Sequence, residues 1–359
     1  MYLNVAEIES AITSLHGAYP GATEVIDLPH PTHEGRTTRL LRVGTRQSDE
    51  VPAILLLGGM HAREWVPPDA LISLAADLLE AHDAVTGLGY GSSTFTAAQV
   101  TRVLEEVSLF FFPCVNPDGR AFSQTTSAMW RKNRRSAPAG STGPSCVGVD
   151  LNRNFDFVWD HKAKFAPDAD VHTSDKPCDP QVYRGPAAAS EPETRNVVWA
   201  LDSHPRIRWM VDVHSAVPVI LHNWGSDQNQ STSPSDNFLN SDLDPIRGRP
   251  DDGIGEFIAE PDLKIAVELA ERMNDAVRAV RGVDYGVEPA YGLYPTSGTS
   301  DDYAYSRHLT DPADAKVFGY TIECGDTFQP EFSEAEEVIR EVSAALLALA
   351  LNAPAVTDA

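Results

Sequence analysis

Short apolar runs alternate along the chain with longer segments of helical periodicity, and this alternation limits the fold more than any other feature. The apolar runs have lengths suited to buried strands and span residues 53–57, 109–115, 207–213, 217–221 and 317–322. The helical periods span residues 68–81, 98–107, 193–203, 262–280 and 334–351. Strands that alternate with helices are typical of α/β proteins, so the pattern predicts an α/β fold.

Composition narrows the class of function. The chain has 359 residues, of which 42% are hydrophobic and 22% charged, as in ordinary globular proteins. Its formal net charge of −24 argues against nucleic-acid binding, because proteins that bind phosphate backbones present a basic face. No run approaches the roughly 20 apolar residues that span a bilayer, so we expect neither a nucleic-acid nor a membrane partner.

Two long stretches lack regular periodicity, at residues 116–184 and 225–261. Such stretches inside a compact protein are usually functional or disordered. The second is rich in Ser, Asn, Asp and Pro, which favours a surface insertion over a hinge between domains. We therefore predict one domain over residues 1–359, with its core at about 5–350.

A histidine and a carboxylate follow the first apolar run. His61 and Glu64 come after two glycines, three residues apart, and His214 ends another apolar run. Catalytic zinc commonly takes two His and one Glu, and sites in α/β sheets cluster at the carboxyl ends of strands. Spacing alone leaves open that these are structural residues at the ends of strands.

A family resemblance adds to this pattern. His61-Ala-Arg-Glu64-Trp resembles the zinc motif of the M14 metallocarboxypeptidases of the carboxypeptidase A and B type. Further signatures follow in the order of that family, from about residue 5 to residue 350: Asn116-Pro-Asp-Gly119, Trp130-Arg-Lys-Asn133, Val149-Asp-Leu-Asn-Arg-Asn-Phe155, His214-Ser215, Tyr294 to Asp302, and Thr321-Ile-Glu323. The resemblance implies a three-layer α/β/α fold around a mixed, mainly parallel twisted sheet. It also implies one Zn²⁺ per chain and peptide or protein substrates with a free C-terminal carboxylate.

The resemblance also assigns roles to residues. It implies that His61, Glu64 and His214 hold the zinc and that Asp150 orients the first histidine. Glu323 matches the general base of the family, although Cys324-Gly325-Asp326-Thr327 departs from the Leu-Arg-Asp-Thr of animal members.

The substrate-binding positions are matched as well. Arg131 matches the arginine that stabilises the oxyanion, while Asn152, Arg153 and Tyr294 match the clamp for the substrate carboxylate. Arg63 adds a secondary contact or forms a structural salt bridge.

Asp301 occupies the pocket-floor position that is apolar in A-type and acidic in B-type enzymes. A buried aspartate there predicts a preference for C-terminal Lys or Arg. The alternative is that Asp301 caps a helix beginning near Asp302 and turns out of the pocket.

Two features of the sequence favour different cellular compartments. Cys146 and Cys178 match the positions of a disulfide in pancreatic enzymes, which favours an oxidising compartment. The acidic first twenty residues do not read as a signal peptide, which favours the cytoplasm. The resemblance is to bacterial-type members without a pro-segment, and we expect a monomer that is active without processing.

Two other functions are compatible with these residues. A hydrolase of N-acyl amino acids or other non-peptide amides would keep the zinc, Glu323 and the clamp. A non-catalytic protein that binds peptide C-termini is disfavoured, because Glu323 and all three zinc ligands are intact.

Overall fold

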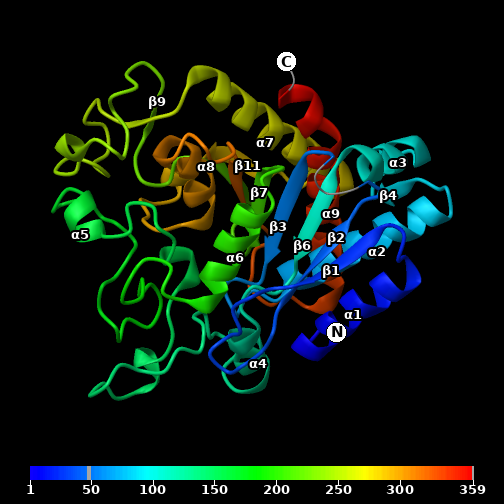
Figure 1. Cartoon of the computed structure of the whole chain (residues 1–359), viewed down its shortest axis with the longest axis horizontal. Coiled ribbons are helices and arrows are strands. Elements are labelled where there is room, and N and C mark those ends of the chain that lie inside the picture. The colour runs from blue at the N-terminus through cyan, green and yellow to red at the C-terminus, as the bar shows by residue number, and fades with distance from the viewer. Residues whose placement is uncertain (47–49, 358–359) are drawn as a thin grey trace.

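The computed structural model describes residues 1–46 and 50–357, and it has an eight-stranded mixed sheet at its centre (Figure 1). The strands lie in the order β1 (Thr23–Asp27), β2 (Arg39–Val43), β6 (Ser108–Phe112), β3 (Ala53–Gly58), β7 (Ile207–His214), β12 (Phe318–Glu323), β8 (Val219–His222) and β11 (Gly286–Pro289). The four strands β6, β3, β7 and β12 run parallel, whereas β1, β2 and β8 bring antiparallel pairings. The predicted mixed α/β sheet is confirmed.

Helices cover both faces of this sheet. They are α1 (Val5–Ala18), α2 (Val66–Asp83), α3 (Ala97–Glu106), α4 (Pro117–Thr125), α5 (His161–Lys164), α6 (Pro192–Ser203), α7 (Glu260–Arg281), α8 (Ser300–Thr310) and α9 (Phe332–Thr357). Side chains of α1, α2, α3, α7 and α9 form one core with one face of the sheet, and α6 and α8 contribute to a second core on the opposite face. This is the expected three-layer arrangement.

The alternation of side chains along a strand explains why both faces are apolar. Ile54 and Leu56 of β3 belong to the first core, whereas Leu55 and Leu57 belong to the second. Successive side chains of a strand point to opposite faces, so a strand buried on both sides must be apolar throughout. This is why the central strands appear in the sequence as continuous apolar runs.

The predicted elements are present with shifted ends. Each of the five predicted helices and five predicted strands overlaps an observed one, and the ends differ by a few residues. The irregular stretch expected at 116–184 contains α4, which the sequence analysis missed. The edge strand β1, its neighbour β2 and the small hairpin of β4 (Leu88–Tyr90) and β5 (Ser93–Phe95) were also missed.

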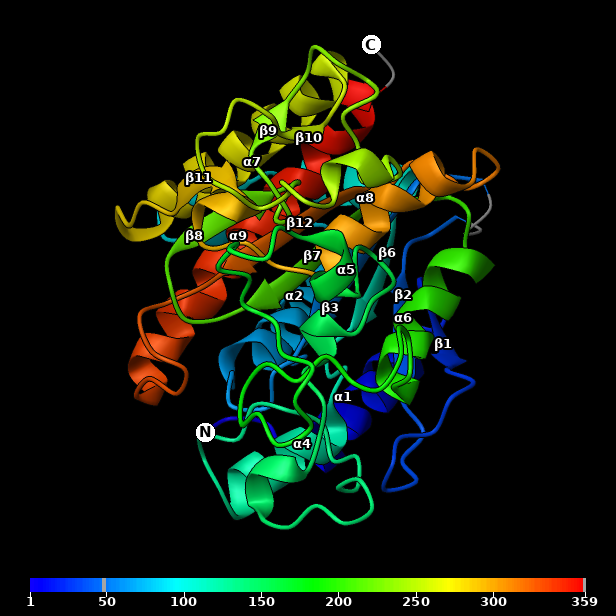
Figure 2. The ribbon, with the colours of Figure 1, turned by 90° about the vertical axis from the view of Figure 1, so that its left-hand side faces the viewer.

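The remaining connections are long and irregular. They carry β9 (Asn229–Gln230), β10 (Glu256–Phe257) and the short 3-10 helices η1 (Pro144–Cys146), η2 (Leu151–Arg153), η3 (Ser241–Leu243) and η4 (Ala290–Gly292). Figure 1 shows much of this material, in green to yellow-green, on the left of the molecule, and Figure 2 turns that side toward the viewer. The role of residues 225–261 as a surface insertion stays a prediction.

Helix α9 bears on the expectation that no segment is apolar enough to span a membrane. Its segment Phe332–Ala355 is long and apolar enough to cross a membrane by length and composition, contrary to the sequence analysis. However, 72% of its most apolar window is buried inside the structure, and the helix packs against α7 and α2. Within the described chain, α9 is therefore accounted for as a core helix.

Candidate active site

Two neighbouring parallel strands bring His61 and His214 together. Gly58 at the end of β3 pairs with Val213 of β7, so the residues that follow these positions leave the sheet at the same edge. A tight turn connects β3 to His61, and Gly59 in this turn has a φ of +65°. A Cβ on Gly59 would lie 2.9 Å from Pro68 Cγ, which explains the glycine at this position.

Glu64 completes a buried cluster with the two histidines. His61 Nδ1 lies 2.8 Å from Glu64 Oε1, and His214 Nδ1 lies 3.0 Å from Glu64 Oε2. The two Nδ1 atoms are 3.0 Å apart. All three side chains are buried, and one ligand atom from each lies within 4.8 Å of the others.

A buried carboxylate lies next to Nε2, the other ring nitrogen, of each histidine. His61 Nε2 lies 3.1 Å from Asp150 Oδ1, and His214 Nε2 lies 3.0 Å from Asp212 Oδ2. A proton on each Nε2 satisfies these contacts and leaves both Nδ1 atoms as electron-pair donors that face Glu64. Because three electron-pair donors repel one another, this cluster needs a cation. Two His and one Glu are the donors of a catalytic zinc site.

The shifted pKa values of His214 and Glu64 are consistent with a cation-binding cluster. Burial alone would lower the pKa of His214, but Asp212 and Glu64 raise it well above its usual value. Burial alone would raise the pKa of Glu64, but His61 and His214 hold it well below its usual range. The raised pKa of His214 and the lowered pKa of Glu64 both indicate that positive charge is favoured beside the Glu64 carboxylate.

Asp150 joins this cluster to Arg131. Arg131 Nε and Nη2 donate to Asp150 Oδ2 at 3.1 and 3.0 Å, and Nη1 lies 4.0 Å from Glu64 Oε1. Burial alone would raise the pKa of Asp150, yet Arg131 and His61 hold it well below its usual value. Asp150 is therefore ionised and fixes both Arg131 and the ring of His61.

Glu323 stands beside the histidine cluster at the end of β12. It pairs in register with His214 of the parallel strand β7. Within the described chain, its carboxylate makes no hydrogen bond to protein, and it lines a pocket together with His61 and Arg131. Burial, aided by the charge of Glu64, raises the pKa of Glu323 to about 7. A carboxylate with this pKa suits proton transfer near neutral pH.

The predicted clamp residues line the same pocket. Asn152 and Arg153 lie on η2, and Tyr294 follows η4. Arg153 Nε donates to His172 O at 2.6 Å and Nη1 to Asn152 O at 2.5 Å, while Nη2 makes no hydrogen bond within the described residues. The Tyr294 ring stacks on His172 and lies 6.0 Å from the guanidinium of Arg153.

Asp301 lies in this pocket and is only 3% exposed. The helix α8 begins at Ser300, with Thr299 at its N-cap, so Asp301 is not the cap. Asp301 Oδ1 accepts from Asp302 N at 2.9 Å, and Oδ2 accepts from Thr321 Oγ1 at 3.1 Å. The hydroxyl of Thr299, which also lines the pocket, is buried and has no hydrogen-bond partner among the described residues.

Arg63 is not brought into this pocket. Its Nη1 donates to Gln181 Oε1 at 2.8 Å, and its guanidinium lies 4.2 Å above the ring of Phe328. Cys146 and Cys178 are joined by a disulfide in the structure, whereas Cys114 and Cys324 are buried thiols.

Several polar residues at this site were not predicted from the sequence. Asp212 contacts His214, and Ser300 contacts both Asp212 and Asn152. The threonines that line the pocket, Thr296, Thr299 and Thr321, were also not singled out. The spacing Asp212-x-His214 was an available signal, because residues two apart share one face of a strand.

A second group of metal-ligating residues lies elsewhere, at His33, Glu191 and Glu193. Glu191 already accepts from His33, Ser190, Asn133 and Arg135. These donors, including the positive charge of Arg135, account for the buried carboxylate of Glu191 without a metal.

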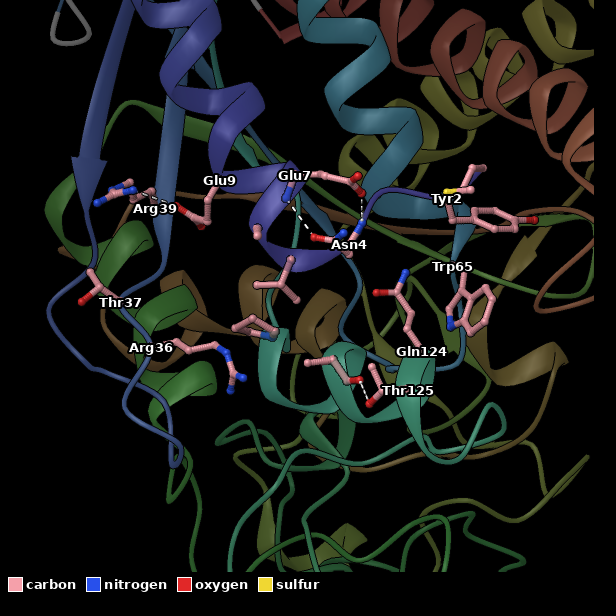
Figure 3. A pocket seen from close by; sticks show the side chains of 15 residues that line it. Tyr2, Asn4, Glu7, Glu9, Arg36, Thr37, Arg39, Trp65, Gln124 and Thr125 are labelled. Atoms are coloured by element: carbon pink, nitrogen blue, oxygen red, sulfur yellow. Dashed lines mark hydrogen bonds and ion pairs between the residues drawn. The ribbon is translucent and has the colours of Figure 1, made fainter.

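Another cavity is separate from the cluster. It measures about 830 Å³ and lies between the first turn of α1 and α4. Figure 3 shows Arg36 and Thr37 on one side of that turn and Trp65 and Gln124 on the other. None of the residues of the histidine cluster lines it.

Comparisons with known proteins agree with this site. A family model described as zinc carboxypeptidase, of the peptidase M14 family, matches residues 8–346. Carboxypeptidase B of Astacus astacus is 30% identical over 91% of this chain and 87% of its own length. Carboxypeptidase A2 of Rattus norvegicus is 31% identical over 85% of this chain but only 59% of its own length.

Solved structures show the same fold. Bovine thrombin-activatable fibrinolysis inhibitor, in complex with tick carboxypeptidase inhibitor, has a TM-score of 0.73 at 22% identity, with 100% of this chain and 98% of that chain covered. Carboxypeptidase A of Helicoverpa armigera also has a TM-score of 0.73, at 21% identity, with 100% of this chain and 74% of that chain covered. With the family match over nearly the whole chain, these findings identify the protein as a member of the zinc carboxypeptidase family, peptidase M14, whose metallopeptidases hydrolyse C-terminal residues from peptides.

Proposed function

We propose that this protein removes C-terminal Lys and Arg residues from peptides, with its zinc held by His61, Glu64 and His214 and with Glu323 as the general base. The observation that carries the proposal is that one pocket is lined by His61 of the histidine cluster, by Glu323 and by Asp301. The identification of this chain as a zinc carboxypeptidase supports the reaction class.

The histidine cluster holds the metal and keeps it accessible to substrate. His61 and His214 would offer Nδ1 and Glu64 its carboxylate, and in catalytic zinc sites with three protein ligands a water molecule takes the fourth position. A bound Zn²⁺ supplies Lewis acidity and lowers the pKa of that water. Asp150 holds the ring of His61 through Nε2.

Glu323 accepts the proton of the attacking water and passes it to the departing amine. Its lack of hydrogen bonds to the described protein leaves its oxygens available for a water. Its pKa of about 7 in the metal-free chain falls when a cation binds nearby, so the carboxylate is ionised at neutral pH. Arg131, held by Asp150, offers Nη1 to the oxyanion that forms at the scissile carbonyl.

Asn152, Arg153 and Tyr294 recognise the C-terminal carboxylate of the substrate. Arg153 has two of its nitrogens fixed by backbone carbonyls, and Nη2 is left for the substrate. An arginine fixed in this way binds a carboxylate with little further loss of side-chain entropy. This clamp places the last peptide bond, and no other, next to Glu323.

Asp301 recognises the side chain of the last residue. It is buried, and its described contacts are neutral donors, the hydroxyl of Thr321 and the backbone N–H of Asp302. A cationic substrate side chain supplies the missing counter-charge, while an apolar one leaves Asp301 uncompensated. The unpaired hydroxyl of Thr299 offers the cation a further acceptor.

A panel of peptides that differ only in their last residue tests the proposal. We expect the highest kcat/KM with C-terminal Lys or Arg, a much lower value with Phe or Leu, and no hydrolysis of the matching C-terminal amides. A value for Phe equal to or above that for Arg would contradict the specificity. Hydrolysis of the amides at the same rate would contradict the clamp.

A further inference from the structure

Asp212 is a buried carboxylate in the middle of the sheet that the proposed reaction does not use directly. It lies on β7, two residues before His214, so both side chains point to the same face of the strand. Asp212 is 0% exposed, and its Oδ2 lies 3.0 Å from His214 Nε2. Ser300 Oγ donates to the same oxygen at 2.7 Å.

Apart from His214 and Ser300, the side chain of Asp212 has few polar contacts. Within the described residues, no Lys or Arg forms an ion pair with it, and its Oδ1 is buried without a hydrogen-bond partner. Burying an ionised carboxylate is costly unless it is paired. The contact with the imidazole of His214 therefore offsets the cost of burying the Asp212 carboxylate.

The contact has a direct consequence for His214. In a neutral imidazole, an Nε2–H donated to a carboxylate leaves the other nitrogen, Nδ1, as the electron-pair donor. Nδ1 is the nitrogen that lies 3.0 Å from Glu64 Oε2. Asp212 therefore does for His214 what Asp150 does for His61, from the opposite side of the cluster.

Ser300 links this arrangement to the substrate pocket. Its hydroxyl donates to Asp212, and its backbone N–H donates to Asn152 Oδ1 at 2.8 Å. The next residue along α8 is Asp301. Ser300 thus contacts Asp212, which lies beside His214, and Asn152 of the proposed carboxylate clamp, and it directly precedes Asp301, the proposed specificity residue.

We propose that Asp212, held by Ser300, is a positioning residue that fixes the tautomer and ring orientation of His214 for metal binding. The inference rests on the proposed role of His214 as a metal ligand. Carboxylates in this position raise the basicity of the histidine, and their removal typically weakens metal binding by about 10- to 100-fold.

The test measures the zinc dissociation constant of the full-length chain by competition with a chelator of known affinity. We expect Asp212→Ala to weaken zinc binding by about 10- to 100-fold. Asp212→Asn, whose amide oxygen still accepts the Nε2–H, weakens it by a smaller factor, and so does Ser300→Ala. The matched control is Asp262→Asn, which alters a buried carboxylate bound by Tyr305 and Lys316, away from the histidines.

The melting temperature of the metal-free chain separates positioning from general stability. Wild-type zinc affinity in both Asp212 variants would overturn the proposal, whatever their melting temperatures. If Asp212→Ala does not fold, the isosteric Asp212→Asn decides alone. His214→Ala tests the underlying ligand set separately: undiminished zinc binding in this variant would refute His214 as a ligand, independently of Asp212.

Discussion

The hydroxyl of Thr321 donates a hydrogen bond of 3.1 Å to the carboxylate of Asp301, inside the pocket that Glu323 also lines. This bond comes from strand β12 and holds Asp301 oriented toward β12. It satisfies one oxygen without neutralising the charge. The pocket therefore holds an oriented, buried carboxylate, on which the proposed preference for C-terminal Lys and Arg rests.

Replacing Asp301 should change the substrate preference. We expect Asp301→Leu to lower kcat/KM for peptides ending in Arg by at least about 100-fold, because breaking one partner of a buried charge pair costs about 3–5 kcal/mol. Hydrolysis of peptides ending in Leu or Phe should increase. Thr321→Val is the matched control, since it removes the hydrogen bond but keeps the charge. An unchanged ratio of Arg to Phe hydrolysis in Asp301→Leu would contradict this role.

Replacing Glu323 should affect the chemical step rather than metal binding. We expect Glu323→Gln to lower kcat by about 10²- to 10⁴-fold, the usual contribution of a general base. Zinc content, measured by atomic absorption, should stay at one ion per chain because the amide contacts no proposed ligand atom. A loss of less than tenfold in kcat, with zinc retained, would exclude Glu323 as the base.

The rate should also depend on the ionisation of Glu323. The base acts as a carboxylate, so kcat/KM should rise with pH through the pKa of Glu323 and then level off on this limb. Burial raises that pKa to about 7 in the metal-free chain, and a bound cation lowers it, so the limb should lie at or below about pH 7. A pH profile of the zinc-loaded enzyme measures it, and Glu323→Gln should lack the limb in its residual activity.

Buried Glu256 should make stability depend on pH. It is 2% exposed, and burial raises its pKa from 4.5 to about 7 despite the nearby Arg247. The folded chain then binds more protons than the unfolded chain between these values. The stabilising contribution is complete below about pH 4.5 and is lost as pH rises through 7, a difference of roughly 3 kcal/mol at 1.36 kcal/mol per pKa unit.

Denaturant unfolding of the wild type and Glu256→Gln at pH 5 and pH 7.5 checks this expectation. The variant should lose less stability than the wild type between the two pH values. Glu336→Gln, at an exposed position, serves as the control for a change in net charge. Equal pH dependence in the wild type and Glu256→Gln would show that Glu256 does not titrate in this window.

Removing the metal should abolish activity and lower stability together. Chelation leaves the buried Glu64 and the two histidines without their cation, and binding at 1,000 times the dissociation constant contributes about 4 kcal/mol. Differential scanning calorimetry with and without chelator measures the shift in melting temperature, and added Zn²⁺ should restore both properties. Activity that persists after complete metal removal would contradict the zinc-dependent reaction.

The sequence by itself determined the layered α/β fold and several of the residues that meet at the site. Continuous apolar runs such as residues 53–57 are typical of strands covered on both faces, because alternate side chains point to opposite sides. Histidines at the ends of two such runs predict convergence at one edge of the sheet. Strands β1 and β2 and helix α4 escaped prediction, because they lack a long apolar period.

Tertiary structure decided how charge is distributed within the site. Asp212 reads in the sequence as an exception within an apolar strand, and only its contact with His214 gives it a role. Arg63 stands next to a motif residue, yet the fold turns it toward Gln181 and Phe328. The physical reason is that the role of a carboxylate or guanidinium depends on the partner opposite it, and that partner is distant in the sequence: Ser300 is 88 residues from Asp212, and Gln181 is 118 residues from Arg63.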